Sequence, residues 1–77
     1  MTPEQFLGRY LRDLRISHGL TLEELAKKLG MSRSYLNQIE LGNRMGSIKI
    51  LTKLASFFNL SLGEILDYSG YSETAEK

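Results

Sequence analysis

Helix-start signals recur along this chain at short intervals, and they constrain its fold more than any other feature of the sequence. A hydroxyl residue followed three positions later by Gln or Glu, the capping-box pattern, occurs at Thr2, Thr21 and Ser61. Ser32 and Ser47 provide the capping hydroxyl alone. Apolar residues recur at helical spacing after each signal, and no segment alternates with period two for long enough to form a strand. The sequence therefore predicts an all-α fold of five helices.

Glycine and asparagine mark where the helices end, because both residues adopt the left-handed conformation of a helix stop. The first helix follows Thr2-Pro3 and ends at His18-Gly19. The expected bounds of the others are 22–29 with a stop at Gly30, 33–41 before Gly42, a helix from Ser47 to a stop at Asn59, and a last helix that fades near Asp67.

The helices at 22–29 and 33–41 are separated by only three residues, one of them Gly30. So short a link makes the two helices cross at a steep angle, which is the helix-turn-helix arrangement. Ala26 provides the small side chain that a close crossing needs, and Gly30 provides the positive φ of the turn. The expected apolar contacts of the motif come from Leu25, Met31, Leu36 and Ile39.

Composition excludes several classes of function. The chain has 77 residues, a mass of 8.8 kDa, no cysteine and one histidine, which provides one domain and neither a disulfide framework nor a thiolate metal site. It contains no long apolar run and no secretory signal at its start. We expect a cytoplasmic protein that is not an enzyme, has no membrane segment and holds no cofactor or metal.

Charge is unevenly distributed along the chain. Residues 1–63 carry nine Lys/Arg and five Asp/Glu, a net +4, whereas residues 64–77 carry one and four, a net −3. We therefore expect a domain at 1–67 and an acidic C-terminal tail at 68–77. The tail is interpreted either as a frayed terminus or as a segment in which Tyr68 and Tyr71 cover a dimer contact or begin a further part of the protein.

The segments Gly19–Ser32 and Ile39–Gly42 resemble the Cro/phage-repressor (Xre-type) helix-turn-helix family, and the resemblance extends from about Gly8 to Leu66. It implies a compact five-helix, lambda-repressor-like domain that binds DNA, usually as a homodimer on a palindromic operator. Three positions depart from the family pattern: Leu22 replaces a Gln that contacts phosphate, Gly46 replaces a proline, and Leu41 replaces a polar residue.

The helix at 33–41 presents a polar face that suits DNA bases. At about 100° per residue, Leu36 and Ile39 point inward while Ser34 and Gln38 point away. Asn37 and Tyr35 then flank this face, and Arg33 in the first turn is long enough to join it. Arg hydrogen-bonds guanine edges, and Gln or Asn hydrogen-bonds adenine. The resemblance assigns base contacts to Arg33, Ser34 and Gln38, with Asn37 as a further candidate; the alternative is an ordinary solvated helix face.

Phosphate contacts are expected around this helix. Backbone N–H groups at Thr21–Leu22 and at the start of the fourth helix near Ser47 suit phosphates, as helix N-termini do. Side-chain candidates are Ser32, Tyr35, Asn43 and Arg44. The resemblance also implies a structural ion pair between Arg15 and Glu40. The remaining cations are interpreted as solvated: Arg9, Arg12, Lys27, Lys28 and Lys53.

The sequence thus predicts a sequence-specific double-stranded DNA-binding regulator, with repression as the expected mode and the nucleoid as its place of action. Ile65, Leu66, Tyr68 and Tyr71 are the expected dimer contacts, with one ring of Phe57-Phe58 as an addition. The alternative is a protein-interaction module or antitoxin-type partner that retains the fold, which Leu22 and the low net charge favour. Neither reading identifies an antagonist or sensor protein.

Overall fold

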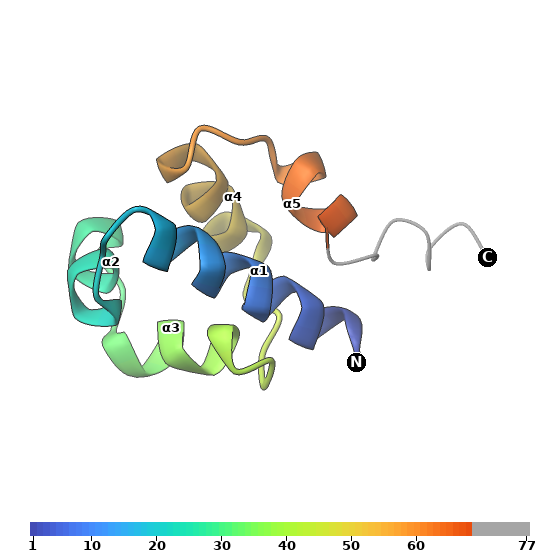
Figure 1. Cartoon of the computed structure of the whole chain (residues 1–77), viewed down its shortest axis with the longest axis horizontal. Helices are drawn as coiled ribbons and strands as arrows, with labels where there is room; N and C mark the ends of the chain where they lie inside the picture. Colours follow the sequence, from blue (N-terminus) through green and yellow to red (C-terminus); the bar gives the residue numbers. More distant parts are fainter. Residues whose placement is uncertain (69–77) are drawn as a thin grey trace.

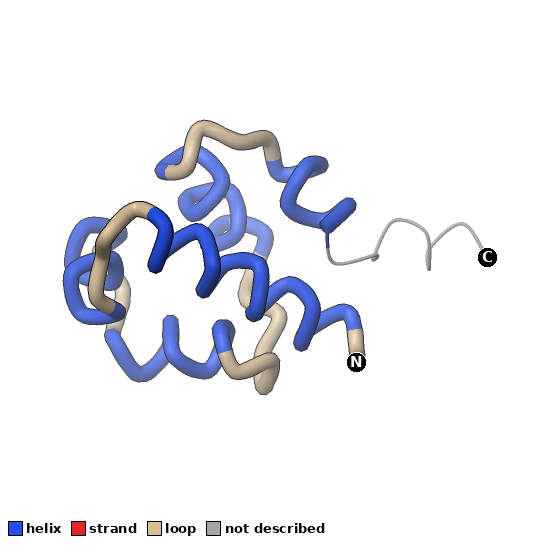
Figure 2. Tube along the Cα trace, viewed as in Figure 1, coloured by secondary structure: helices blue, strands red, loops and turns tan. Residues whose placement is uncertain are grey.

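Five α-helices make up the part of the chain that the computed structural model describes, residues 1–68 (Figure 1). They are α1 (Pro3–Ser17), α2 (Leu22–Leu29), α3 (Arg33–Glu40), α4 (Ile48–Phe57) and α5 (Leu62–Tyr68). Loops alone join the helices, and this described part contains no strand (Figure 2). The expectations for Tyr71 and the rest of the tail lie outside the described residues.

All five predicted N-caps form. At Thr2, Thr21 and Ser61 the hydroxyl accepts a hydrogen bond from the backbone N–H three residues on, and the side chain at that position accepts one in return. Ser32 and Ser47 accept the first of these two hydrogen bonds. Each helix therefore begins at the residue that its capping signal predicts.

The helix ends also follow the sequence signals. Gly30 and Asn59 adopt left-handed conformations, with φ of 68° and 60°. The third helix ends at Glu40, one residue earlier than expected, and Leu41 serves as its C-cap. Leu41 keeps a helical backbone conformation and, at about 100° per residue, falls on the outward side of α3, where its side chain is 58% exposed.

The hydrophobic core takes residues from every helix, and α1 packs against both α3 and α5 (Figure 1). Phe58 is buried, whereas Phe57 stays partly exposed with its ring perpendicular to that of Phe58. Ile65 is fully buried in this core, so its assignment to a dimer contact is wrong. None of the described helices has the length and apolar character needed to cross a bilayer.

At Gly8, α1 lies very close to the backbone at the end of α3. A Cβ atom at this position would lie 2.5 Å from the carbonyl oxygen of Glu40 and closer still to that of Ile39. Both contacts are with backbone, which cannot rotate away, so only a hydrogen fits between the helices. The glycine therefore sets how closely the end of α3 lies against α1.

Candidate nucleic-acid interface

The turn between α2 and α3 holds the two helices at a steep angle, with α3 along the lower edge of the molecule in Figure 1. The N–H of Met31 donates to the carbonyl of Ala26 at 3.0 Å, and that of Gly30 donates to Lys27 at 3.2 Å. These hydrogen bonds satisfy the last carbonyls of α2 within the turn. Ser32 then caps α3 immediately, so the turn is a rigid link between the two helices.

The polar face of α3 is accessible as the sequence predicts. Leu36 and Ile39 are fully buried, Arg33 and Ser34 are exposed, and the other two base-contact candidates, Asn37 and Gln38, are half-buried. The helix carries one acid, Glu40, which is buried and turned toward α1. The exposed face of α3 is therefore free of carboxylates that would repel DNA.

Gln38 has a side-chain partner that the sequence did not suggest. The amide Nδ2 of Asn43 donates to Oε1 of Gln38 at 2.9 Å, and the backbone N–H of Asn43 donates to the carbonyl of Gln38 at 3.0 Å. This hydrogen bond engages Oε1 and so holds the Gln38 amide in one orientation. Asn43, expected at a phosphate, is thus also the residue that orients Gln38.

Arg44 and Tyr35 lie together beside α3. The guanidinium carbon of Arg44 is 5.8 Å from the centre of the Tyr35 ring, a cation–π contact. By the same angular count, Tyr35 flanks the polar face of α3 on the side opposite Glu40, which points toward α1. Two of the expected phosphate contacts therefore share one side of the exposed face.

The N-terminus of α2 is a weaker phosphate site than the sequence suggests. The backbone N–H of Thr21 is already hydrogen-bonded to Oε1 of Glu24 at 2.8 Å. This hydrogen bond from the Thr21 backbone, together with a hydrogen bond between the Thr21 side chain and the carboxyl group, lowers the pKa of Glu24 below its usual value. Glu23 adds a second acid to the same turn, so negative charge stands where a phosphate would approach.

The N-terminus of α4 has a more favourable charge. Its cap is Ser47, its first turn contains no acid, and Lys49 lies in that turn with an exposed side chain. Free N–H groups, the positive end of the helix dipole and a lysine together favour an anion. α3 likewise begins without an acid in its first turn, behind the cap Ser32.

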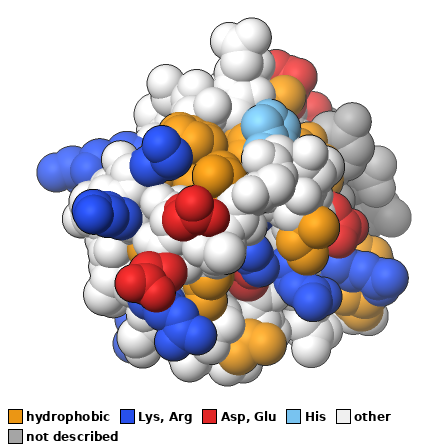
Figure 3. Space-filling model, turned by 60° about the vertical axis from the view of Figure 1, so that its left-hand side comes forward, with side chains coloured by type: hydrophobic (Ala, Val, Ile, Leu, Met, Phe, Trp, Pro, Cys, Tyr) orange, Lys and Arg blue, Asp and Glu red, His pale blue; other side chains and the backbone are white. Residues whose placement is uncertain are grey.

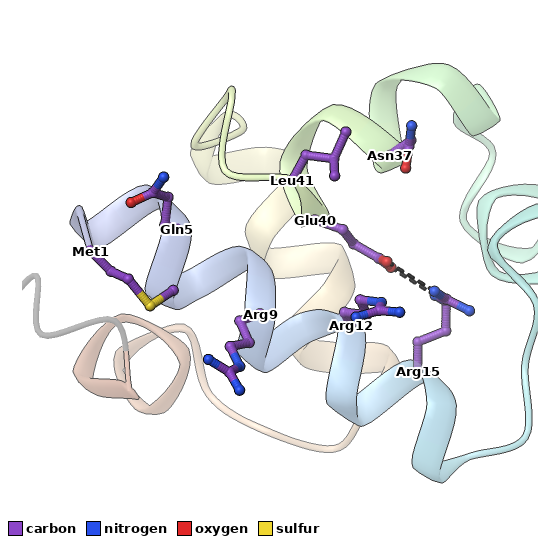
Figure 4. Close-up of a pocket in the computed structure, with 8 residues that line it drawn as sticks. All are labelled: Met1, Gln5, Arg9, Arg12, Arg15, Asn37, Glu40 and Leu41. Carbon is purple, nitrogen blue, oxygen red and sulfur yellow. Dashed lines mark hydrogen bonds and ion pairs between the residues drawn. The ribbon is translucent and has the colours of Figure 1, made fainter.

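Arg15 and Glu40 form a bidentate ion pair between α1 and α3 (Figure 4). The Nε and Nη2 atoms of Arg15 donate to the two carboxylate oxygens at 2.8 and 3.0 Å, and Nη1 donates to the carbonyl of Leu20 at 2.9 Å. The two side chains are only 12% and 4% exposed, and the hydrogen bonds to Glu40 raise the pKa of Arg15. The pair therefore orients α3 against α1.

Lys53 is not simply solvated, as the sequence suggested. Its Nζ lies 3.4 Å from the carbonyl oxygen of Leu29, at the end of α2. A cation at a helix C-terminus interacts favourably with the last carbonyls and the helix dipole. Lys53 thus connects α4 to the helix-turn-helix motif.

Positive and negative side chains are mixed on one face of the molecule (Figure 3). On the face shown in Figure 3, Lys and Arg side chains are separated by acidic ones. A net charge of +1 over the whole chain agrees with this mixture. So low a net charge gives little long-range attraction for DNA, and the positions of individual cations then matter more than their total.

Comparisons with known proteins agree with this motif. A family model described as "Helix-turn-helix" matches residues 11–65. The ImmF control region 10 kDa protein of Bacillus phage phi105 is 37% identical over 76 residues, which cover 90% of this chain and 84% of that protein.

Two solved structures resemble the whole domain. The clp gene regulator ClgR from Corynebacterium glutamicum matches with a TM-score of 0.80 and 28% identity, over 99% of this chain and 81% of that one. SinR, the master regulator for biofilm formation, was solved in complex with DNA. It matches with a TM-score of 0.72 and 34% identity, over 79% of this chain and 98% of the SinR chain. The chain belongs to the helix-turn-helix family.

Proposed function

We propose that this protein is a DNA-binding transcriptional regulator that reads double-stranded DNA in the major groove with α3. The observation that carries the proposal is the exposed, carboxylate-free face of α3 on a rigid helix-turn-helix, in a family to which a DNA-bound structure also belongs. Arg33, Ser34, Asn37 and Gln38 would contact base edges. Their position on one short helix limits the sequence read by one protomer to a few base pairs.

The proposed phosphate contacts surround this face. Arg44 and Tyr35 lie on one side, the cap residues Ser32 and Ser47 begin α3 and α4, and Asn43 follows α3. Thr21 is the weakest member, because its N–H is engaged by Glu24. Leu22 is half-buried against the core, so its side chain is not proposed as a phosphate contact. These contacts position the domain without selecting a sequence.

The proposal includes a homodimer on a palindromic operator, acting as a repressor in the nucleoid. One recognition helix reads too few base pairs for useful specificity, and two helices set about one DNA turn (~34 Å) apart read enough. Leu66 is half-buried and Phe57 is 38% exposed, and both provide apolar surface for such a contact. The family is one of transcription regulators, so no enzymatic step is proposed.

Selection of binding sites from random double-stranded DNA tests this function directly. The proposal expects an enriched palindrome whose half-sites are about one helical turn apart. Sedimentation of the protein with and without the selected site measures the number of protomers bound. Failure to enrich any sequence, with no binding at low salt, would instead assign the fold to a protein-interaction module or an antitoxin-type partner.

A further inference from the structure

A groove of about 660 Å³ runs between α1 and α3 (Figure 4). Its α1 side is lined by Gln5, Arg9, Arg12 and Arg15, and its α3 side by Asn37 and Leu41, among others. Asn37 belongs to the proposed base-reading face, and Leu41 follows it at the end of the helix. The groove is therefore continuous with the surface that α3 presents to DNA.

The groove carries positive charge that has no partner among the residues the structure describes. Arg15 is neutralised by Glu40, so the charge comes from Arg9 and Arg12. Within residues 1–68 neither of these guanidinium groups has an ion pair or hydrogen bond, and both side chains are exposed. Two arginines one helical turn apart, without a partner among residues 1–68, thus line a groove whose other polar side chains are the amides Gln5 and Asn37 and the Arg15–Glu40 pair.

Cations lie on both sides of the exposed face of α3. A helix in the major groove, which is about 12 Å wide, lies between the phosphate backbones of the two strands. Arg44 flanks the exposed face of α3 on the side of Tyr35. Arg9 and Arg12 flank it on the opposite side, along α1. With α3 bound in the major groove, the domain would then have a cation next to each of the two phosphate backbones.

We propose that Arg9 and Arg12 bind the phosphate backbone of the DNA strand that borders α3 on its α1 side. This inference rests on the proposed function and extends the phosphate contacts to a helix outside the helix-turn-helix motif. A guanidinium suits the role because its planar set of donors matches phosphate oxygens. The Arg15–Glu40 pair fixes the spacing of α1 and α3, so both arginines are held at a set distance from the reading face.

The test is the salt dependence of DNA binding by the Arg9→Gln/Arg12→Gln variant, with Lys27→Gln as the matched control. Lys27 is an exposed cation on the outward side of α2 and lies outside the groove. Each phosphate contact contributes about 0.9 to the slope of log K against log [salt]. The double variant should therefore have a slope shallower by about 1.8 per protomer, on the selected operator and on unrelated DNA alike.

The outcomes separate this inference from the function on which it rests. Wild-type protein that binds no DNA refutes the proposed function itself. If the wild-type protein binds DNA but the double variant and Lys27→Gln have the same slope of log K against log [salt], only the inference is overturned. A double variant that loses sequence preference without a change in this slope also overturns it. If the double variant instead loses affinity for a poly-glutamate peptide at an unchanged DNA slope, the groove belongs to an acidic protein partner and the inference is wrong. Urea unfolding of both variants, with unchanged midpoints expected, shows that the comparison is between folded proteins.

Discussion

Replacing Gly8 by alanine should disrupt the contact that sets the position of α3. The added Cβ would meet the backbone carbonyls of Ile39 and Glu40 at 2.5 Å or less, and neither can move without shifting the end of α3. Overpacking of this kind costs up to about 3 kcal/mol, while the better helix propensity of alanine returns about 1 kcal/mol. The expected net loss of unfolding free energy is about 2 kcal/mol.

Gly63→Ala provides the matched control. It is also a helical glycine, but the nearest atom to its added Cβ, the Ser61 hydroxyl oxygen, lies at an ordinary 3.8 Å. We expect it to stabilise the protein by up to about 1 kcal/mol. Thermal unfolding followed by circular dichroism should show a Tm of Gly8→Ala roughly 8–16 °C below that of the wild type. A Gly8→Ala protein that melts as high as Gly63→Ala would refute the close approach of α1 and α3.

Two further predictions concern the polar contacts that hold the helices. Glu40→Ala leaves the 12%-exposed guanidinium of Arg15 without its partner and should lower the free energy of unfolding in urea by about 3 kcal/mol. Arg15→Met/Glu40→Met should recover most of that loss. A double variant as unstable as the single one contradicts this account of the pair. Hydrogen bonds with Thr21 lower the pKa of Glu24 in the folded protein. The ionised Glu24 carboxylate therefore stabilises the fold above its unfolded-state pKa of about 4.3, and this stabilisation is lost as the pH falls through the lower folded-state pKa. Glu24→Gln should therefore lessen the acid-induced loss of stability between pH 5 and pH 3, and an unchanged pH profile would show that the capping box contributes no pH dependence.

The helices were predictable because their signals are local. Each cap and stop involves residues at most five positions apart, so the sequence places the start of every helix and the left-handed residues Gly30 and Asn59. The buried and exposed sides of α3 follow from the helical period in the same way. Only its last residue differed, because Leu41 acts as a C-cap rather than as part of the helix.

Contacts between helices were less predictable, because they depend on distances that a single sequence does not contain. Gly8 in the middle of α1 was a signal of close packing, but its neighbours on α3 appear only in the fold. Asn43 and Gln38 are five residues apart across a helix end, which no periodic pattern covers. The role of Lys53 at the end of α2 and the burial of Ile65 were also visible only in the fold.

The central claim is that α3 reads bases while the residues beside it hold the phosphates. Gln38→Ala tests the first half, since a glutamine amide makes two hydrogen bonds to an adenine edge and Asn43 holds it in place. Arg44→Ala tests the second half, because Arg44 lies at the side of the exposed face. Lys27→Ala, an exposed cation on α2, is the control.

The decisive measurement is the affinity of these three variants for the selected operator and for unrelated DNA across a salt series. Gln38→Ala should lose about 1–3 kcal/mol per half-site on the operator and little on unrelated DNA. Arg44→Ala should weaken both DNAs alike and reduce the salt slope by about one unit per protomer, and Lys27→Ala should do neither. Equal weakening of both DNAs by Gln38→Ala, or a loss of sequence preference alone in Arg44→Ala, would contradict this orientation of the domain on DNA.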